Sequence, residues 1–211
     1  MTRQLVFIHG RSQQSKDPVK LKKTWVDAWK QGLQKSGLEI PIAESDIKFP
    51  FYGDTLAALT EGLSPNEAAR IVIRGTGDGV DPNETEFVRG MLMKTQELAG
   101  ITDQQVQDQA EGPVEKGIGN WEWIQNIVEA IDTHVPGASG AAIALATRDV
   151  YKYINNDGIQ NIIDEGVAKA VTPGVETIVV GHSLGAVVSY HLLKTKGNYS
   201  ALRISSGRNR R

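Results

Sequence analysis

The sequence of 211 residues contains no cysteine. This absence excludes disulfide bonds, a thiolate nucleophile and any cysteine-ligated zinc or iron–sulfur site. An excess of positive charge is also missing, because 23 Lys and Arg residues stand against 25 Asp and Glu residues, for a formal net charge of −2. Proteins that bind nucleic acid usually carry a basic surface, so we expect no nucleic-acid partner.

Long hydrophobic runs are absent as well. The first apolar run, Leu5 to Ile8, is too short for the hydrophobic region of a secretion signal. The longest apolar stretch, 140–146, is too short to cross a bilayer. We therefore expect a cytoplasmic protein with no transmembrane segment.

Apolar runs and helical periodicity predict an α/β fold with a parallel sheet and flanking helices. The runs 5–8 and 177–180 are continuous and apolar, as in strands buried on both faces of a parallel sheet, and 47–49 is a shorter candidate strand. Between the strands at 5–8 and 47–49, Asp17 and Pro18 predict the start of a helix that ends before Gly37. A further short strand is possible over 201–204.

The segment 54–174 has almost entirely helical signals. Two helix starts have the spacing of a capping box, at 64–67 and 81–84, and the second leads into a predicted apolar face of Phe87, Met91, Leu92 and Leu98. A crossover between parallel strands needs only one helix, and the segment 54–174 is much longer than that. Its additional helices predict a helical insertion that caps the carboxyl ends of the strands. The expected parts are 1–53, a strand–helix–strand part of the α/β core; 54–174, the helical insertion; and 175–211, a strand and helix with a basic tail.

A G-x-S-x-G motif follows the strand at 177–180 and opens an apolar helical run. Strand, turn and helix in this order are the setting of a nucleophile elbow. We expect glycine at both ends because the turn is too tight for side chains there, and a strained serine backbone that lifts the hydroxyl clear of the sheet. The motif residues are Gly181, His182, Ser183, Leu184 and Gly185.

Together with Phe7-Ile8-His9-Gly10-Arg11, this motif resembles the α/β-hydrolase superfamily. The resemblance implies a serine hydrolase that acts on a small-molecule ester, or less often an amide, through an acyl-enzyme, without metal or cofactor. It also implies that Ser183 is the nucleophile and that the backbone N–H groups of Arg11 and Leu184 form the oxyanion hole. The supporting residues that it implies are His9, Gly10, Gly181, His182 and Gly185.

The chain departs from that family after Ser183. Family members supply the catalytic acid and then the histidine after the nucleophile, whereas this sequence has no Asp or Glu there and only His191. On a helix, His191 would lie about 12 Å beyond Ser183 and out of reach. We therefore expect a fold that lacks its C-terminal part and an impaired activity. His134 in the insertion stays open as a substitute base, and a non-catalytic binding protein of the same fold is the alternative function.

Overall fold

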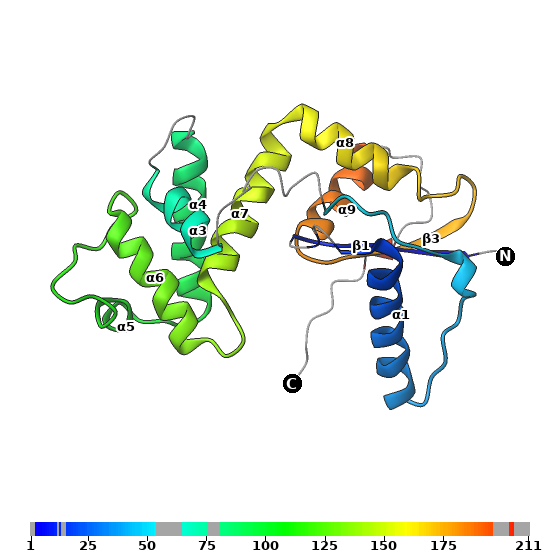
Figure 1. The fold of residues 1–211 in the computed structure, drawn as a ribbon, viewed down its shortest axis with the longest axis horizontal. Coiled ribbons are helices and arrows are strands. Elements are labelled where there is room, and N and C mark those ends of the chain that lie inside the picture. The colour runs from blue at the N-terminus through cyan, green and yellow to red at the C-terminus, as the bar shows by residue number, and fades with distance from the viewer. Residues whose placement is uncertain are drawn as a thin grey trace. The chain divides into compact units, whose positions relative to one another are not determined.

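The computed structural model describes residues 3–11, 13, 16–53, 65–75, 81–195 and 203–204. The chain divides into two compact units, which are described separately (Figure 1). One unit, which we call the sheet unit, comprises residues 1–59 and 156–211, and the other, the helical unit, comprises residues 60–155. The division differs from the sequence-based boundaries mainly in one helix, at 157–168, which the sequence placed in the insertion and the structure places in the sheet unit.

The sheet unit contains a parallel sheet, so the predicted α/β class is confirmed. Its order is β2-β1-β3-β4, and every neighbouring pair is parallel. The central strand β1 is buried almost throughout, which explains its unbroken apolar sequence. The strands are β1 (Arg3–Ile8), β2 (Ile47–Lys48), β3 (Glu176–Gly181) and β4 (Arg203–Ile204).

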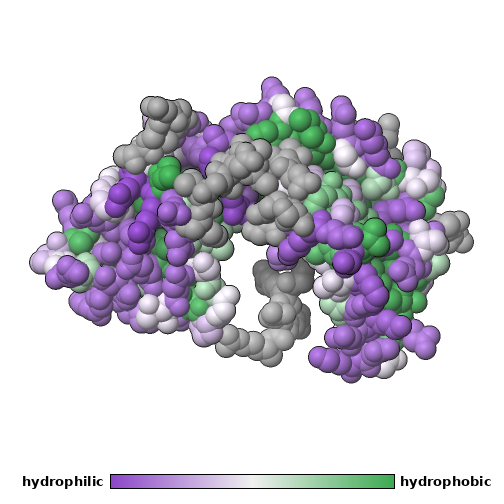
Figure 2. Space-filling view, in the orientation of Figure 1, coloured by the Kyte–Doolittle hydropathy of each residue, from purple (hydrophilic) through white to green (hydrophobic). Residues whose placement is uncertain are grey.

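Helices cover both faces of this sheet (Figure 1). Leu5 and Phe7 of β1 pack with Trp25 and Val26 of α1, while Ile8 lies with residues of α8 and α9 on the opposite face. The alternation follows from the strand, whose successive side chains point to opposite sides. The outer side of α1 is hydrophilic, as its surface at the lower right of Figure 2 shows. These helices are α1 (Pro18–Lys35), α8 (Asp157–Ala168) and α9 (Leu184–Thr195), with a 3₁₀ turn η1 (Glu44–Asp46) before β2.

The helical unit has its own apolar core. Trp123, Ile127 and Ile131 of α6 are buried in it, and Leu92 of α4 and Leu145 of α7 pack with them. A separate core of this size explains why the segment forms its own compact unit. Its helices are α3 (Pro65–Arg74), α4 (Pro82–Leu98), α5 (Asp103–Gln107), α6 (Trp121–His134) and α7 (Gly140–Asn155).

The predicted apolar face of α4 is wrong in part. Val88 and Leu92 point into the core, whereas Phe87, Met91 and Leu98 are 36%, 43% and 77% exposed. The helix carries apolar residues on more than one side, so its periodicity did not define a single buried face. Tertiary packing selected the side that also carries Glu84 and Thr85.

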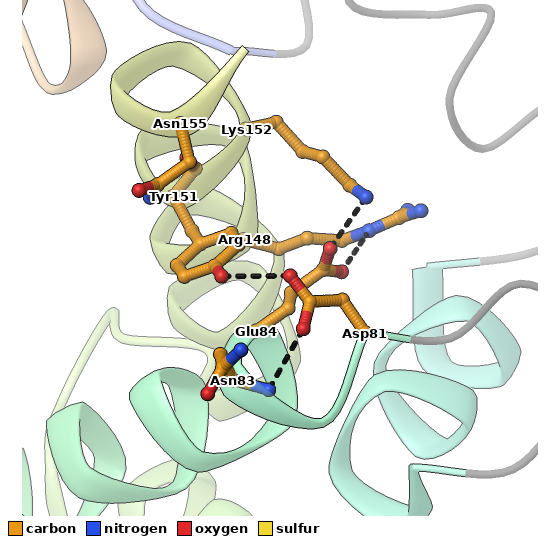
Figure 3. Close-up of polar contacts among 7 residues, drawn as sticks. All are labelled: Asp81, Asn83, Glu84, Arg148, Tyr151, Lys152 and Asn155. Carbon is orange, nitrogen blue, oxygen red and sulfur yellow. Dashed lines mark hydrogen bonds and ion pairs between the residues drawn. The ribbon is translucent and has the colours of Figure 1, made fainter.

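The start of α4 is joined to α7 by a polar network, drawn in Figure 3. Asp81 caps α4 as predicted, since its carboxylate accepts a bond of 2.9 Å from the N–H of Asn83. Glu84 is not a capping residue, contrary to the prediction, because its carboxylate lies 2.9 Å from Arg148 Nε and 2.6 Å from Lys152 Nζ. Glu84 is 6% exposed, so these two cations neutralise a buried charge.

Candidate active site

Ser183 occupies the turn between β3 and α9. Its φ of 55° is the only positive φ of a non-glycine residue in the described part of the chain. Such a backbone is strained for an L-residue and persists only where the surrounding structure enforces it. A hydrogen bond of 3.0 Å from the His182 N–H to the Ile8 carbonyl joins this turn to the end of β1.

The two glycines of the motif are enforced by backbone contacts. A Cβ at Gly181 would lie 2.5 Å from the Gly185 carbonyl oxygen and 2.7 Å from Ala186 Cα. A Cβ at Gly185 would lie 2.1 Å from the carbonyl oxygen of Ile8. These distances are far below van der Waals contact, so the steric reason given above for both glycines holds in the structure.

The loop after β1 lies directly against Ser183. A Cβ on Gly10 would be 2.8 Å from the Ser183 Cβ and 2.9 Å from the His182 carbonyl oxygen. This proximity follows from the register, which pairs Ile8 with Gly181 and so ends both strands at the same edge of the sheet. The structure therefore brings together the two motifs on which the resemblance rested.

The backbone groups around Ser183 suit an oxyanion. Leu184 is the first residue of α9, where N–H groups lack partners within the helix and the helix dipole is positive. Arg11 directly follows Gly10, whose backbone lies against Ser183. A negative oxygen beside the Ser183 hydroxyl would thus meet the positive end of α9.

His9 is fully buried and positions the loop rather than accepting a proton from a nucleophile. Its Nε2 accepts a bond of 3.1 Å from the N–H of Tyr52, which leaves the proton on Nδ1 to be donated over 2.8 Å to the Gly10 carbonyl. The rings of His9 and Tyr52 stack at 4.1 Å, and the Tyr52 hydroxyl donates to the His9 carbonyl. Tyr52 was not among the site residues predicted from the sequence, because its role depends on a contact 43 positions away.

Burial lowers the pKa of His9 below its ordinary value of 6.5. The unfolded chain therefore binds a proton more readily, and stability falls as the pH drops below 6.5 towards the folded-state pKa. His9→Gln should flatten this slope by up to about 1.4 kcal/mol per pH unit. Urea unfolding at a series of pH values from about 7.5 to 5.5 measures the slope of the free energy of unfolding against pH. His134→Gln, an exposed site, should keep the wild-type slope; equal slopes in both variants would contradict the assignment.

The other histidines of the sheet unit have different surroundings. His182 is exposed, with its ring edge-on to Trp25 at 6.0 Å. His191, on α9, has its Nδ1 2.9 Å from the carboxylate of Asp164 on α8. This pair could not be predicted from the sequence, because its members belong to different helices and are 27 positions apart. The Ser183 hydroxyl has no hydrogen-bond partner among the described residues.

His134, the substitute base left open by the sequence, is the last residue of α6 in the helical unit. It is exposed, and the neighbouring Asp132 accepts a bond of 2.6 Å from the N–H of Gly140. Asp132 therefore serves the start of α7 and does not orient the histidine.

Comparisons with protein-family models, curated proteins and solved structures find no match for this chain. Within the described residues, no group of three or more His, Asp or Glu side chains is arranged to hold a metal ion. None of the described helices combines the length and apolar character needed to cross a membrane. Any assignment of function therefore rests on the geometry around Ser183.

Proposed function

We propose that this protein is a serine hydrolase of the α/β-hydrolase type, with Ser183 as its nucleophile and with an activity impaired by the lack of a catalytic acid and histidine after it. The observation that carries the proposal is the positive φ of Ser183 at a strand-to-helix turn. Glycine would adopt this backbone at lower cost, so a serine there suggests that its hydroxyl is used. The contact between Gly10 and Ser183 adds the loop that an oxyanion hole needs.

The proposed reaction is the hydrolysis of a carboxylic ester in two steps. The Ser183 oxygen bonds to the carbonyl carbon and loses its proton, and the N–H groups of Arg11 and Leu184 stabilise the oxyanion. The bond to the alcohol then breaks, and the alcohol leaves with the proton that Ser183 lost. Water then attacks the acyl-enzyme, which releases the carboxylic acid and returns the proton to Ser183. Preorganised donors of this kind contribute about 10²–10³ in rate each.

The second candidate is a non-catalytic binding protein with the same fold. It is favoured because no imidazole of the described residues makes a hydrogen bond to the Ser183 hydroxyl, and because His191 pairs with Asp164. Without a base, a serine hydroxyl is a weak nucleophile. The two candidates predict opposite results with a reagent that reacts only with activated serines.

Labelling with a fluorophosphonate tests the proposal. We expect the wild-type chain to be labelled on Ser183, Ser183→Ala to lose the label, and Ser36→Ala, at the exposed end of α1, to retain it. Mass spectrometry of the labelled peptide identifies the site. An unlabelled wild-type chain with a cooperative unfolding transition would leave the binding protein as the function.

Ser183→Gly supplies a control that does not depend on activity. It removes the hydroxyl and also the backbone strain. Its free energy of unfolding should therefore exceed that of Ser183→Ala by about 1 kcal/mol, which appears as a higher urea midpoint. A gain in stability with loss of labelling is the result expected of a strained catalytic residue. Equal stability of the two variants would remove the strain argument.

A further inference from the structure

The helical unit contains a hollow of about 370 Å³ at the end of α3 and the start of α4. It lies in a different compact unit from Ser183. Two arginines contribute to its wall, one from each of these helices. The lining residues used below are Arg74, Glu86, Arg89, Ile118 and Gly119.

Arg89 carries a charge without an acidic partner. Its Nε donates over 2.7 Å to the Ile73 carbonyl, and one terminal nitrogen donates over 3.0 Å to the Arg74 carbonyl. The other terminal nitrogen is 3.3 Å from the carbonyls of Ile118 and Gly119. Among the described residues no carboxylate contacts it. Burial lowers its pKa, but an arginine stays protonated at neutral pH, so a partly desolvated cation faces neutral oxygens.

Arg74 is held by an aromatic ring instead of a carboxylate. Its guanidinium carbon lies 4.2 Å from the centre of the Trp121 ring. This stacking uses the face of the guanidinium and leaves its N–H edge to other acceptors. No ion pair of Arg74 occurs in the described part of the chain.

The net charge of the lining defines what the hollow would accept. Glu86 is the single carboxylate of the described lining, and with two arginines it leaves a net charge of +1 there. An anion in the hollow would compensate this charge.

We propose that this hollow binds a small organic anion through its carboxylate or phosphate group. The N–H edge of Arg74 can bind either oxyanion through paired donors. Arg89 supplies positive charge beside it, since most of its N–H groups already donate to backbone carbonyls. Ile118 gives the wall an apolar part for the group that carries the anion. The site is independent of the proposed hydrolase, because it uses no residue of the Ser183 turn.

Titration with two probes, inorganic phosphate and benzoate at constant ionic strength, tests the site. The readout is the NMR signals of the Trp121 indole and the Arg89 Nε–H. We expect saturable shifts of these signals with at least one probe. Arg74→Gln should weaken binding about 10-fold, as expected for the loss of one charge-assisted contact. Glu86→Gln should strengthen binding a few-fold because it removes a like charge.

Lys94→Gln is the matched control, since it removes the same charge from an exposed position of α4 outside the lining. It should bind the probe as the wild type does. A response to phosphate alone assigns a phosphorylated ligand, and a response to benzoate alone assigns a carboxylate. No saturable response with either probe in the folded protein, or equal weakening by Lys94→Gln and Arg74→Gln, would overturn the proposal.

Discussion

Gly185→Ala is expected to destabilise the sheet unit by more than about 3 kcal/mol, the upper range for overpacking a close-packed site. The new methyl group would lie 2.1 Å from the carbonyl oxygen of Ile8 and 2.7 Å from that of His9. Both atoms belong to the backbone at the end of β1, so no side-chain rotation can relieve the clash. The turn that carries Ser183 would have to move away from β1, and fluorophosphonate labelling should be lost with it.

Gly32→Ala is the control for this change. Gly32 lies in α1, and nothing is within 4 Å of a Cβ placed there. Alanine should therefore stabilise the protein by about 0.5–1 kcal/mol through its helix propensity and the smaller entropy of the unfolded chain. Urea unfolding monitored by circular dichroism measures both variants. A Gly185→Ala chain as stable as the wild type would show that the close approach of turn and strand is incorrect.

The second large effect is expected for Glu84→Gln in the helical unit. The amide is nearly the same size as the carboxylate but leaves Arg148 and Lys152 without their shared negative charge (Figure 3). Removing one partner of a buried ion pair costs about 3–5 kcal/mol. The lower end applies here, because the two cations are 18% and 25% exposed and water screens part of their charge.

Glu97→Gln provides the comparison for Glu84→Gln. Glu97 pairs with Lys94 at 2.7 Å, but its side chain is 69% exposed. The loss should stay below about 1 kcal/mol, as for other surface pairs, and it should shrink further in salt. Thermal or urea unfolding distinguishes the two variants, and a similar small loss in both would mean that the network of α4 and α7 contributes little.

Several features were determined by the sequence alone. The apolar runs of β1 and β3 predicted buried parallel strands, and the positions of Asp17 and Asp81 before proline predicted two helix starts that the structure has. The G-x-S-x-G spacing after a strand predicted a tight turn into a helix, which Ser183 occupies. All of these are local, because strands, caps and turns depend on residues a few positions apart.

Other features depend on contacts between distant parts of the chain, and only the tertiary structure decided them. The buried side of α4 was one, since the helix has apolar residues on several sides and packing against its neighbours selected among them. The pairing of Glu84 with α7 was another, as was the bond between His191 and Asp164. A local pattern carries no information about which distant side chain will complete such a pair.

The candidate site itself combines both kinds of information. The motif residues were identified from the sequence. The approach of Gly10 to Ser183 arises from the parallel register of β1 and β3. The bond from Tyr52 to His9 arises from the path of the chain after β2. These contacts join segments that are 43 to more than 170 positions apart. The sequence by itself therefore determined which residues have the required chemistry, and the tertiary structure decided which of them lie together, because only folding brings distant segments within bonding distance.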